Sequence, residues 1–129
     1  MATHSTARTL LRRFAVSLYG APPGYPVAAF CALLAARGIG GIGLTPDAVS
    51  MMEPDGLASL LARHDLRASS LNSAGYLLHA DAQAAAIQER LEARLFDAAV
   101  ALDTPVNVIP GGLLHAGPRL DSIHAACAP

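Results

Sequence analysis

Polar residues and glycines recur in this sequence at the points where short apolar runs end. Their hydroxyl, amide and carboxylate groups are suited to hydrogen-bonding a small polar ligand. The same residue types are also what ordinary turns use, so each position alone is equally consistent with a plain loop. A binding site follows only if the fold gathers the set along one wall of a cleft. The set is Tyr19, Thr45, Asp47, Asn72, Ser73, Pro110, Gly111 and Gly112.

Two histidines, His79 and His115, follow later apolar runs and add a second possible chemistry. Two imidazoles on one face of a protein can join a metal site or move protons. The sequence supplies no further evident ligand for the pair, so we expect solvated loop histidines. Asp47 is the one candidate carboxylate at a predicted strand end. A serine nucleophile is not indicated, because no G-x-S-x-G turn is present.

The elements that would position these residues are short strands alternating with amphipathic helices. The clearest unit is a predicted strand at 67–71, a polar loop at 72–80, and a long helix that Asp81 caps. Residues 45–54 are predicted to form another loop. The βαβαβαβα order predicts an α/β fold with a parallel sheet and right-handed crossovers. The expected strands are 14–18, 40–44, 67–71 and 105–109, and the expected helices are 26–37, 55–64, 82–102 and 120–126.

Composition bounds the class of protein. The chain has 129 residues, which suits one domain over residues 14–129 after a frayed lead-in at 1–13. A transit peptide or twin-arginine signal is the alternative for that lead-in. The formal net charge of -1 argues against a nucleic-acid partner. No apolar run reaches the roughly 20 residues of a membrane span. Cys31 and Cys127 are expected to be free thiols in the cytoplasm.

Five stretches resemble, in order and spacing, the N-terminal half of a xylose-isomerase-like TIM barrel, the sugar phosphate isomerase/epimerase family. They are FAVSLYG, ARGIGGIGL, LLARHDLRASSLNSAGYL, RLFDAAVALDTPVNVIPGG and GPRLDSIHAA. The resemblance implies isomerisation or epimerisation of a sugar or polyol, with a divalent metal (Mn, Mg or Zn). It also implies that the strand-end set, together with His79 and His115, lines one wall of the substrate pocket.

The chain is shorter than a complete barrel of that family. A complete eightfold barrel takes about 250 residues, and four βα units are present here. In the family most metal ligands follow the later strands, so no metal ligand or catalytic residue is assigned, and the chain alone is expected to be inactive. We expect a truncated half barrel with two open edges and an apolar open face, hence self-association or a complementing half. The alternatives are a non-catalytic fragment or assembly subunit, and a small flavodoxin-like ligand-binding domain.

Overall fold

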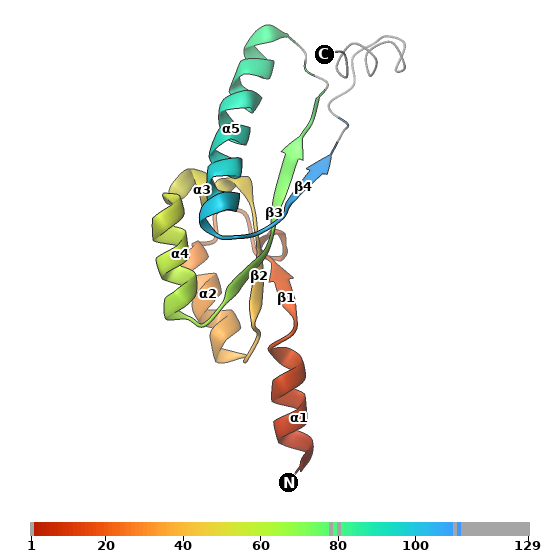
Figure 1. The fold of residues 1–129 in the computed structure, drawn as a ribbon, viewed down its shortest axis with the longest axis vertical. Helices are drawn as coiled ribbons and strands as arrows, with labels where there is room; N and C mark the ends of the chain where they lie inside the picture. Colours follow the sequence, from red (N-terminus) through yellow and green to blue (C-terminus); the bar gives the residue numbers. More distant parts are fainter. Residues whose placement is uncertain (1, 78, 80, 110, 112–129) are drawn as a thin grey trace.

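Four parallel strands form one sheet in the computed structural model, which describes residues 2–77, 79, 81–109 and 111 (Figure 1). The strand order is β1-β2-β3-β4, so strands that are consecutive in the sequence are neighbours in space. Every pairing is parallel, and the predicted α/β class with a parallel sheet, like half of a βα barrel, is confirmed. The strands are β1 (Ala15–Ser17), β2 (Gly41–Leu44), β3 (Arg67–Gly75) and β4 (Val106–Ile109).

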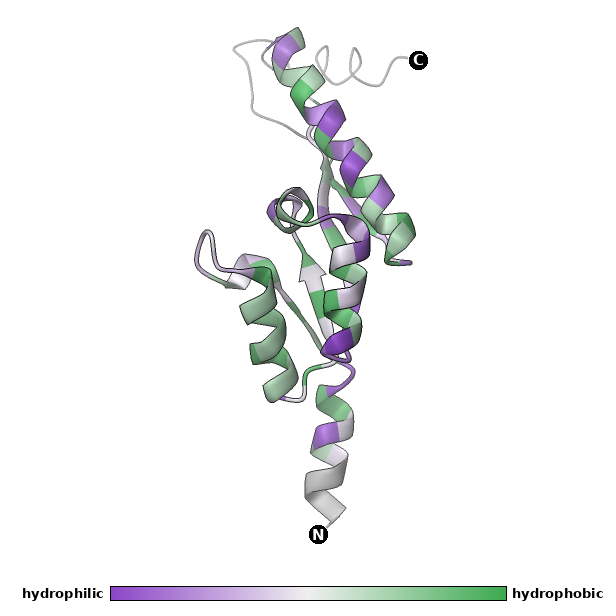
Figure 2. Ribbon diagram, turned by 90° about the vertical axis from the view of Figure 1, so that its left-hand side faces the viewer, coloured by the Kyte–Doolittle hydropathy of each residue, from purple (hydrophilic) through white to green (hydrophobic). Residues whose placement is uncertain are grey.

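Helices connect the strands and cover one face of the sheet, as the two ribbon views show (Figures 1 and 2). A single 3₁₀ turn, η1 (Leu18–Gly20), follows β1. Among the described helices, none combines the length and the apolar character that crossing a bilayer requires. The helices are α1 (Ala2–Leu11), α2 (Val27–Ala36), α3 (Pro46–Met51), α4 (Pro54–Arg63) and α5 (Ala82–Ala101).

The hydrophobic core lies between the sheet and helices α2 to α5. From the strands it takes Ile42, Leu44 and Leu71, and from α5 it takes Leu95, all fully buried. Burying each such side chain contributes about 1.5–3 kcal/mol. Because successive strand residues point to opposite faces, the residues between these apolar ones must lie on the other side of the sheet. From α4 the core takes Leu57, Leu60 and Leu61, which are all buried.

One face of the sheet is not covered by helices and is called the open face below. Most of its side chains are small or polar. Gly43 alternates with Ile42 and Leu44 and is paired with Ser17 on one side and Ser70 on the other. The expected apolar open face is therefore wrong. The physical reason is the two-residue period: each strand gives its large side chains to the helix side. The open face carries Ala15, Ser17, Gly41, Gly43, Arg67, Ser70, Asn72, Asn107 and one large apolar residue, Ile109.

Both outer strands have one unpaired edge within the described residues, as predicted. β1 pairs only with β2, and β4 pairs only with β3. Large apolar side chains are exposed beside these edges: Phe14 is 60% exposed and Val108 is 59% exposed. An unpaired edge flanked by apolar side chains is a surface that a further strand can cover.

Three segments differ from the sequence-based expectation. Residues expected as a loop at 45–54 contain α3, which begins at Pro46 with Asp47 in its first turn, where proline and an acidic side chain both favour a helix start. β3 does not end at Leu71 but continues to Gly75, because its second half pairs with β4. The predicted helix at 120–126 lies outside the described residues.

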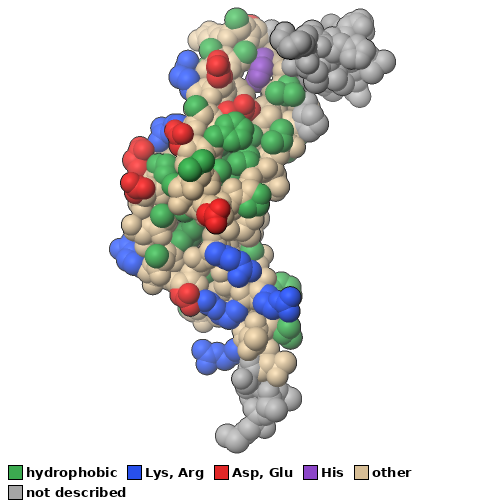
Figure 3. Space-filling view, in the orientation of Figure 1, with side chains coloured by type: hydrophobic (Ala, Val, Ile, Leu, Met, Phe, Trp, Pro, Cys, Tyr) green, Lys and Arg blue, Asp and Glu red, His purple; other side chains and the backbone are tan. Residues whose placement is uncertain are grey.

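The lead-in expected to be frayed instead forms α1, which projects from the end of the sheet where the strands begin (Figure 1). An ion pair between Arg12 and Asp65 joins the end of this segment to the body. The backbone of Arg12 also lies against Gly40, where a Cβ would come within 1.9 Å of the Arg12 carbonyl oxygen. Figure 3 shows arginine side chains gathered at this end of the molecule. Six of the nine arginines precede or begin strands there: Arg8, Arg12, Arg13, Arg37, Arg63 and Arg67.

Candidate functional site

A cavity of about 210 Å³ lies beyond the C-terminal ends of β1 and β2. Parallel strands bring their carboxyl ends to one edge of the sheet, which is where barrels of this kind place their ligand sites. Three of the predicted site residues, Tyr19, Thr45 and Asp47, line it. The remaining lining comes from most of residues 18–25 and from Val27, Ala48 and Met51. The cavity lining therefore combines apolar side chains with three hydroxyl-bearing residues, Tyr19, Tyr25 and Thr45, and one carboxylate.

The segment after β1 forms one wall through local hydrogen bonds. The Tyr19 amide donates to the Ser17 hydroxyl at 3.3 Å, which starts η1. The amide of Tyr25 closes a turn by donating to the Pro22 carbonyl at 3.0 Å. This turn includes Gly24 at a φ of +75°, a conformation that glycine adopts without steric cost. The Tyr25 ring then meets Phe30 of α2 edge to face, at a centroid distance of 6.2 Å.

The start of α3 forms the other wall. Thr45 occupies the N-cap position in an extended conformation and is only 4% exposed. Asp47 is exposed in the first helical turn, where the helix dipole favours a negative charge. Its carboxylate is thus held at the mouth of the cavity, with both oxygens able to accept hydrogen bonds.

Tyr19 links the cavity to the open face of the sheet. Although 60% of this residue is exposed, its hydroxyl donates to the Asn72 carbonyl at 3.2 Å, across the strand that separates them. The Asn72 side-chain amide donates to the Ser70 hydroxyl at 3.1 Å. The Asn107 amide in turn donates to the Asn72 side-chain oxygen. Asn72 therefore contacts the cavity wall through its main-chain carbonyl and β4 through its side chain.

The other predicted site residues do not line the cavity. Ser73 is 6% exposed within β3, so it is a strand residue and not part of a loop. His79 is half-buried and Gly111 is half-buried, and neither contributes to the cavity wall. Pro110, Gly112 and His115 lie outside the described residues. The structure thus brings together the residues that follow β1 and β2, with Asn72 beside them.

The end of β3 is fixed by two α5 side chains, Gln88 and Glu92, to which the sequence analysis gave no role. The Gly75 amide donates to the Glu92 carboxylate at 2.6 Å. The Gln88 amide donates to the Gly75 carbonyl at 3.2 Å and to the Glu92 carboxylate at 3.1 Å. The spacing of four residues on a predicted helix was the available signal, since it puts both side chains on one face.

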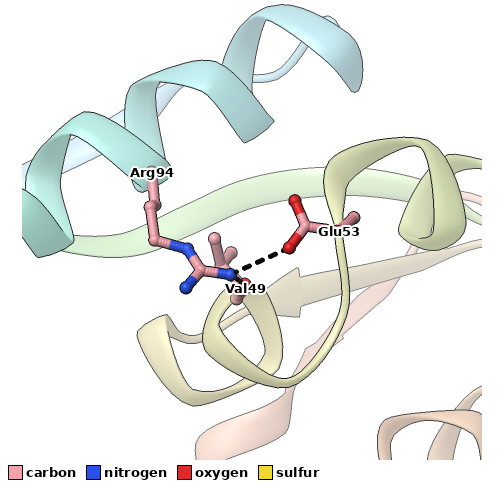
Figure 4. A network of polar contacts seen from close by, with 3 residues as sticks. All are labelled: Val49, Glu53 and Arg94. Carbon is pink, nitrogen blue, oxygen red and sulfur yellow. Dashed lines mark hydrogen bonds and ion pairs between the residues drawn. The ribbon is translucent and has the colours of Figure 1, made fainter.

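A second cavity, of about 50 Å³, lies where α5 crosses the junction of α3 and α4. Arg94 reaches across it and donates to the Val49 carbonyl at 3.4 Å and to the Glu53 carboxylate at 3.3 Å (Figure 4). Because these contacts tie three helices together, we interpret this cavity as a packing feature.

The divalent metal that the resemblance implies would need several ligand side chains close together. Within 2–77, 79, 81–109 and 111, no three His, Cys, Asp or Glu side chains lie together as a metal group would require. Asp47 is a single carboxylate at the cavity. These residues therefore do not make a metal site by themselves, and no chemical step is assigned to a metal here.

Comparison with known proteins supports the fold. No protein family model matches the chain, and no curated protein does. The crystal structure of protein SMc04130 from Sinorhizobium meliloti 1021 is similar, with a TM-score of 0.65 at 19% sequence identity. The similar region covers 88% of this chain and 42% of that protein, so the chain spans less than half of its length. At this identity the similarity establishes a shared fold.

Proposed function

We propose that this chain forms the substrate-binding half of a barrel that isomerises or epimerises a sugar or a related polyol. The observation that supports the proposal is the cavity at the carboxyl ends of β1 and β2, where Tyr19, Thr45 and Asp47 meet an apolar wall. Sugars present hydroxyl groups on one side and C–H groups on the other, so they suit a site of this mixed character. The resemblance of the sequence to sugar phosphate isomerases and epimerases points the same way.

Each polar group has a defined task in this proposal. The Asp47 carboxylate accepts hydrogen bonds from two neighbouring hydroxyls of the ligand. The Thr45 hydroxyl bonds to the next ligand oxygen. The Tyr19 hydroxyl donates its proton to the Asn72 main-chain carbonyl, which holds the ring in place, and it accepts a hydrogen bond from a ligand hydroxyl. The proton-transfer groups and the ligands of a divalent metal, which would polarise the substrate oxygens, would come from the complementing half.

The complementing half would be a second copy of this chain or further polypeptide that supplies the later strands. The unpaired edges of β1 and β4 support this part of the proposal, since both must be covered to close a barrel. We place the protein in the cytoplasm, where a thiol such as that of Cys31, which is free and buried, stays reduced.

The same open edges favour a second candidate, a non-catalytic assembly subunit. The two candidates differ in whether the cavity binds a polyol, so ligand binding separates them. A flavodoxin-like domain is less well supported, because its strand order is not sequential, whereas the order here is β1-β2-β3-β4.

The test is a titration of the full chain with xylitol, followed by ligand-detected NMR. Asp47→Asn is compared with Asp55→Asn, its matched control. Both aspartates are exposed and follow a proline in the first turn of a helix, Pro46 in α3 and Pro54 in α4, but only Asp47 lines the cavity. We expect about tenfold weaker binding for Asp47→Asn, because a hydrogen bond to a charged group is worth about 1.5–3 kcal/mol. Equal effects of the two substitutions, or no binding by the unmodified chain, would refute the proposal.

A further inference from the structure

The Asp47 carboxylate gives the cavity a negative charge that no neighbouring cation offsets within the described part of the chain. Asp47 is the one charged side chain among the described residues that line the cavity, and neither ion pair of those residues, Arg12–Asp65 or Arg94–Glu53, involves it. The chain has no lysine, and Figure 3 shows arginine side chains gathered at the end of the molecule where the strands begin, away from the cavity. An anionic ligand is therefore repelled at this site, and a cationic ligand is attracted.

The polar groups of the cavity lining also offer more hydrogen-bond acceptors than donors. Both oxygens of the Asp47 carboxylate can only accept. The Tyr19 hydroxyl gives its proton to the Asn72 carbonyl at 3.2 Å, so toward a ligand it can only accept as well. The Thr45 hydroxyl makes no hydrogen bond to the start of α3 and can serve a ligand in either direction. An ammonium group has three donors and no acceptor, whereas the oxygens of an ionised phosphate accept, so the lining favours the ammonium in hydrogen bonding as well as in charge.

The cavity can take the carbon chain of such a ligand while the charged group stays at its mouth. Its volume of about 210 Å³ accommodates a five- or six-carbon polyol, and the buried side chains of Leu18 and Val27 in the lining suit C–H groups. Asp47 is exposed, so an ammonium beside it keeps part of its water and avoids most of the cost of burying a charge. For the same reason the attraction is moderate, like that of an exposed ion pair.

We infer that the ligand of the cavity is an amino sugar or amino polyol, whose ammonium group binds between the Asp47 carboxylate and the Tyr19 hydroxyl. The ammonium takes the place of one of the hydroxyls that Asp47 would otherwise bind, and the carbon chain packs inside the cavity. This inference rests on the proposed function and narrows its substrate class. It makes Asp47 the residue that selects cationic over neutral ligands and rejects phosphorylated ones.

The test compares three ligands that share one six-carbon chain and differ in a terminal group: sorbitol, its amine glucamine, and sorbitol 6-phosphate. Each is titrated with the full chain at pH 7 and followed by ligand-detected NMR. We expect glucamine to bind about threefold more tightly than sorbitol, and sorbitol 6-phosphate to bind more weakly than sorbitol. Asp47→Asn removes the charge but keeps an acceptor oxygen, so the affinities for glucamine and sorbitol should become equal. Asp55→Asn removes the same charge outside the cavity and should keep the threefold difference.

The outcomes separate this inference from the proposed function. If sorbitol binds and Asp47→Asn weakens its binding, but glucamine binds no more tightly than sorbitol or the phosphate binds most tightly, the selection of a cation is refuted and the cavity assignment stands. A preference for glucamine that persists in Asp47→Asn also refutes the selection by Asp47. If the unmodified chain binds none of the three ligands, both proposals are refuted. Circular dichroism melts of each variant exclude a loss of folding, which would reduce binding of all three ligands together.

Discussion

Replacing Gly75 with alanine should open the sheet between β3 and β4. Gly75 has a φ of +99°, which costs an L-residue about 1–2 kcal/mol. An added Cβ would lie 2.1 Å from the Ile109 carbonyl oxygen and within 2.9 Å of two further Ile109 backbone atoms. Backbone cannot rotate away as a side chain can, so the two strands must separate there.

The separation also removes hydrogen bonds. The Tyr76 amide donates to the Ile109 carbonyl at 2.7 Å, a bond worth about 0.5–1.5 kcal/mol. The charge-assisted bond from the Gly75 amide to Glu92, at 2.6 Å, is worth about 1.5–3 kcal/mol. Together with the strain at residue 75, the expected loss in the free energy of unfolding is about 3–6 kcal/mol.

Urea denaturation followed by circular dichroism measures this loss, and Gly38→Ala is the control. Gly38 has a comparable φ of +72° but nothing within 4 Å of its added Cβ, so Gly38→Ala reports the backbone strain alone, about 1–2 kcal/mol. Hydrogen exchange should show the β4 amides losing protection only in Gly75→Ala. Equal destabilisation by the two substitutions would refute the close approach of β3 and β4.

Three further predictions concern the core and the surface. Leu95→Ala should lower the free energy of unfolding by about 2–5 kcal/mol in urea denaturation, because Leu95 is fully buried and leaves a cavity; a loss below 1 kcal/mol would contradict its place in the core. Burial raises the pKa of the Cys31 thiol from 9.0 to about 11. Between these two pH values the folded state keeps the thiol proton, whereas the unfolded chain loses it. The contribution of the protonated Cys31 thiol to the free energy of unfolding is complete below pH 9 and is lost as the pH rises through about 11. A thiol-reactive dye at pH 8 should label Cys31 in a Cys127→Ser background only after unfolding, and fast labelling of the folded chain would argue against its burial. Glu53→Gln should change stability by less than about 1 kcal/mol in thermal melts, because its ion pair with Arg94 is largely exposed; a larger loss would show that the pair is shielded from water.

The sequence predicted the sheet well because its signals were local. Apolar runs bounded by glycine or proline mark strands, and Ile42 and Leu44 did so at the correct place. The second half of β3 was missed because its residues, Asn72 to Gly75, are small or polar and typical of a loop. Their strand conformation comes from pairing with β4, which lies more than 30 residues away in the sequence. The residues next to Asn72 in the sequence do not indicate such a distant partner.

The candidate site was predicted in part for the same reason. Tyr19, Thr45 and Asp47 could be grouped because the carboxyl ends of neighbouring parallel strands meet at one edge. Ser73 was misplaced with the loop residues, since extending β3 by a few positions turned its side chain into the protein. The role of Glu92 could not be found, because it depends on a backbone amide of a strand whose end was itself misplaced.

The way α1 attaches to the body has a practical consequence for trimming the protein. Arg8 is exposed within α1, whereas the chain at Arg12 lies against Gly40 and is paired with Asp65. Limited digestion with trypsin should therefore cut first after Arg8 and release a short peptide. Protease-resistant material beginning at Thr9 should keep the melting temperature of the intact chain, which would make it the better starting material for crystallisation.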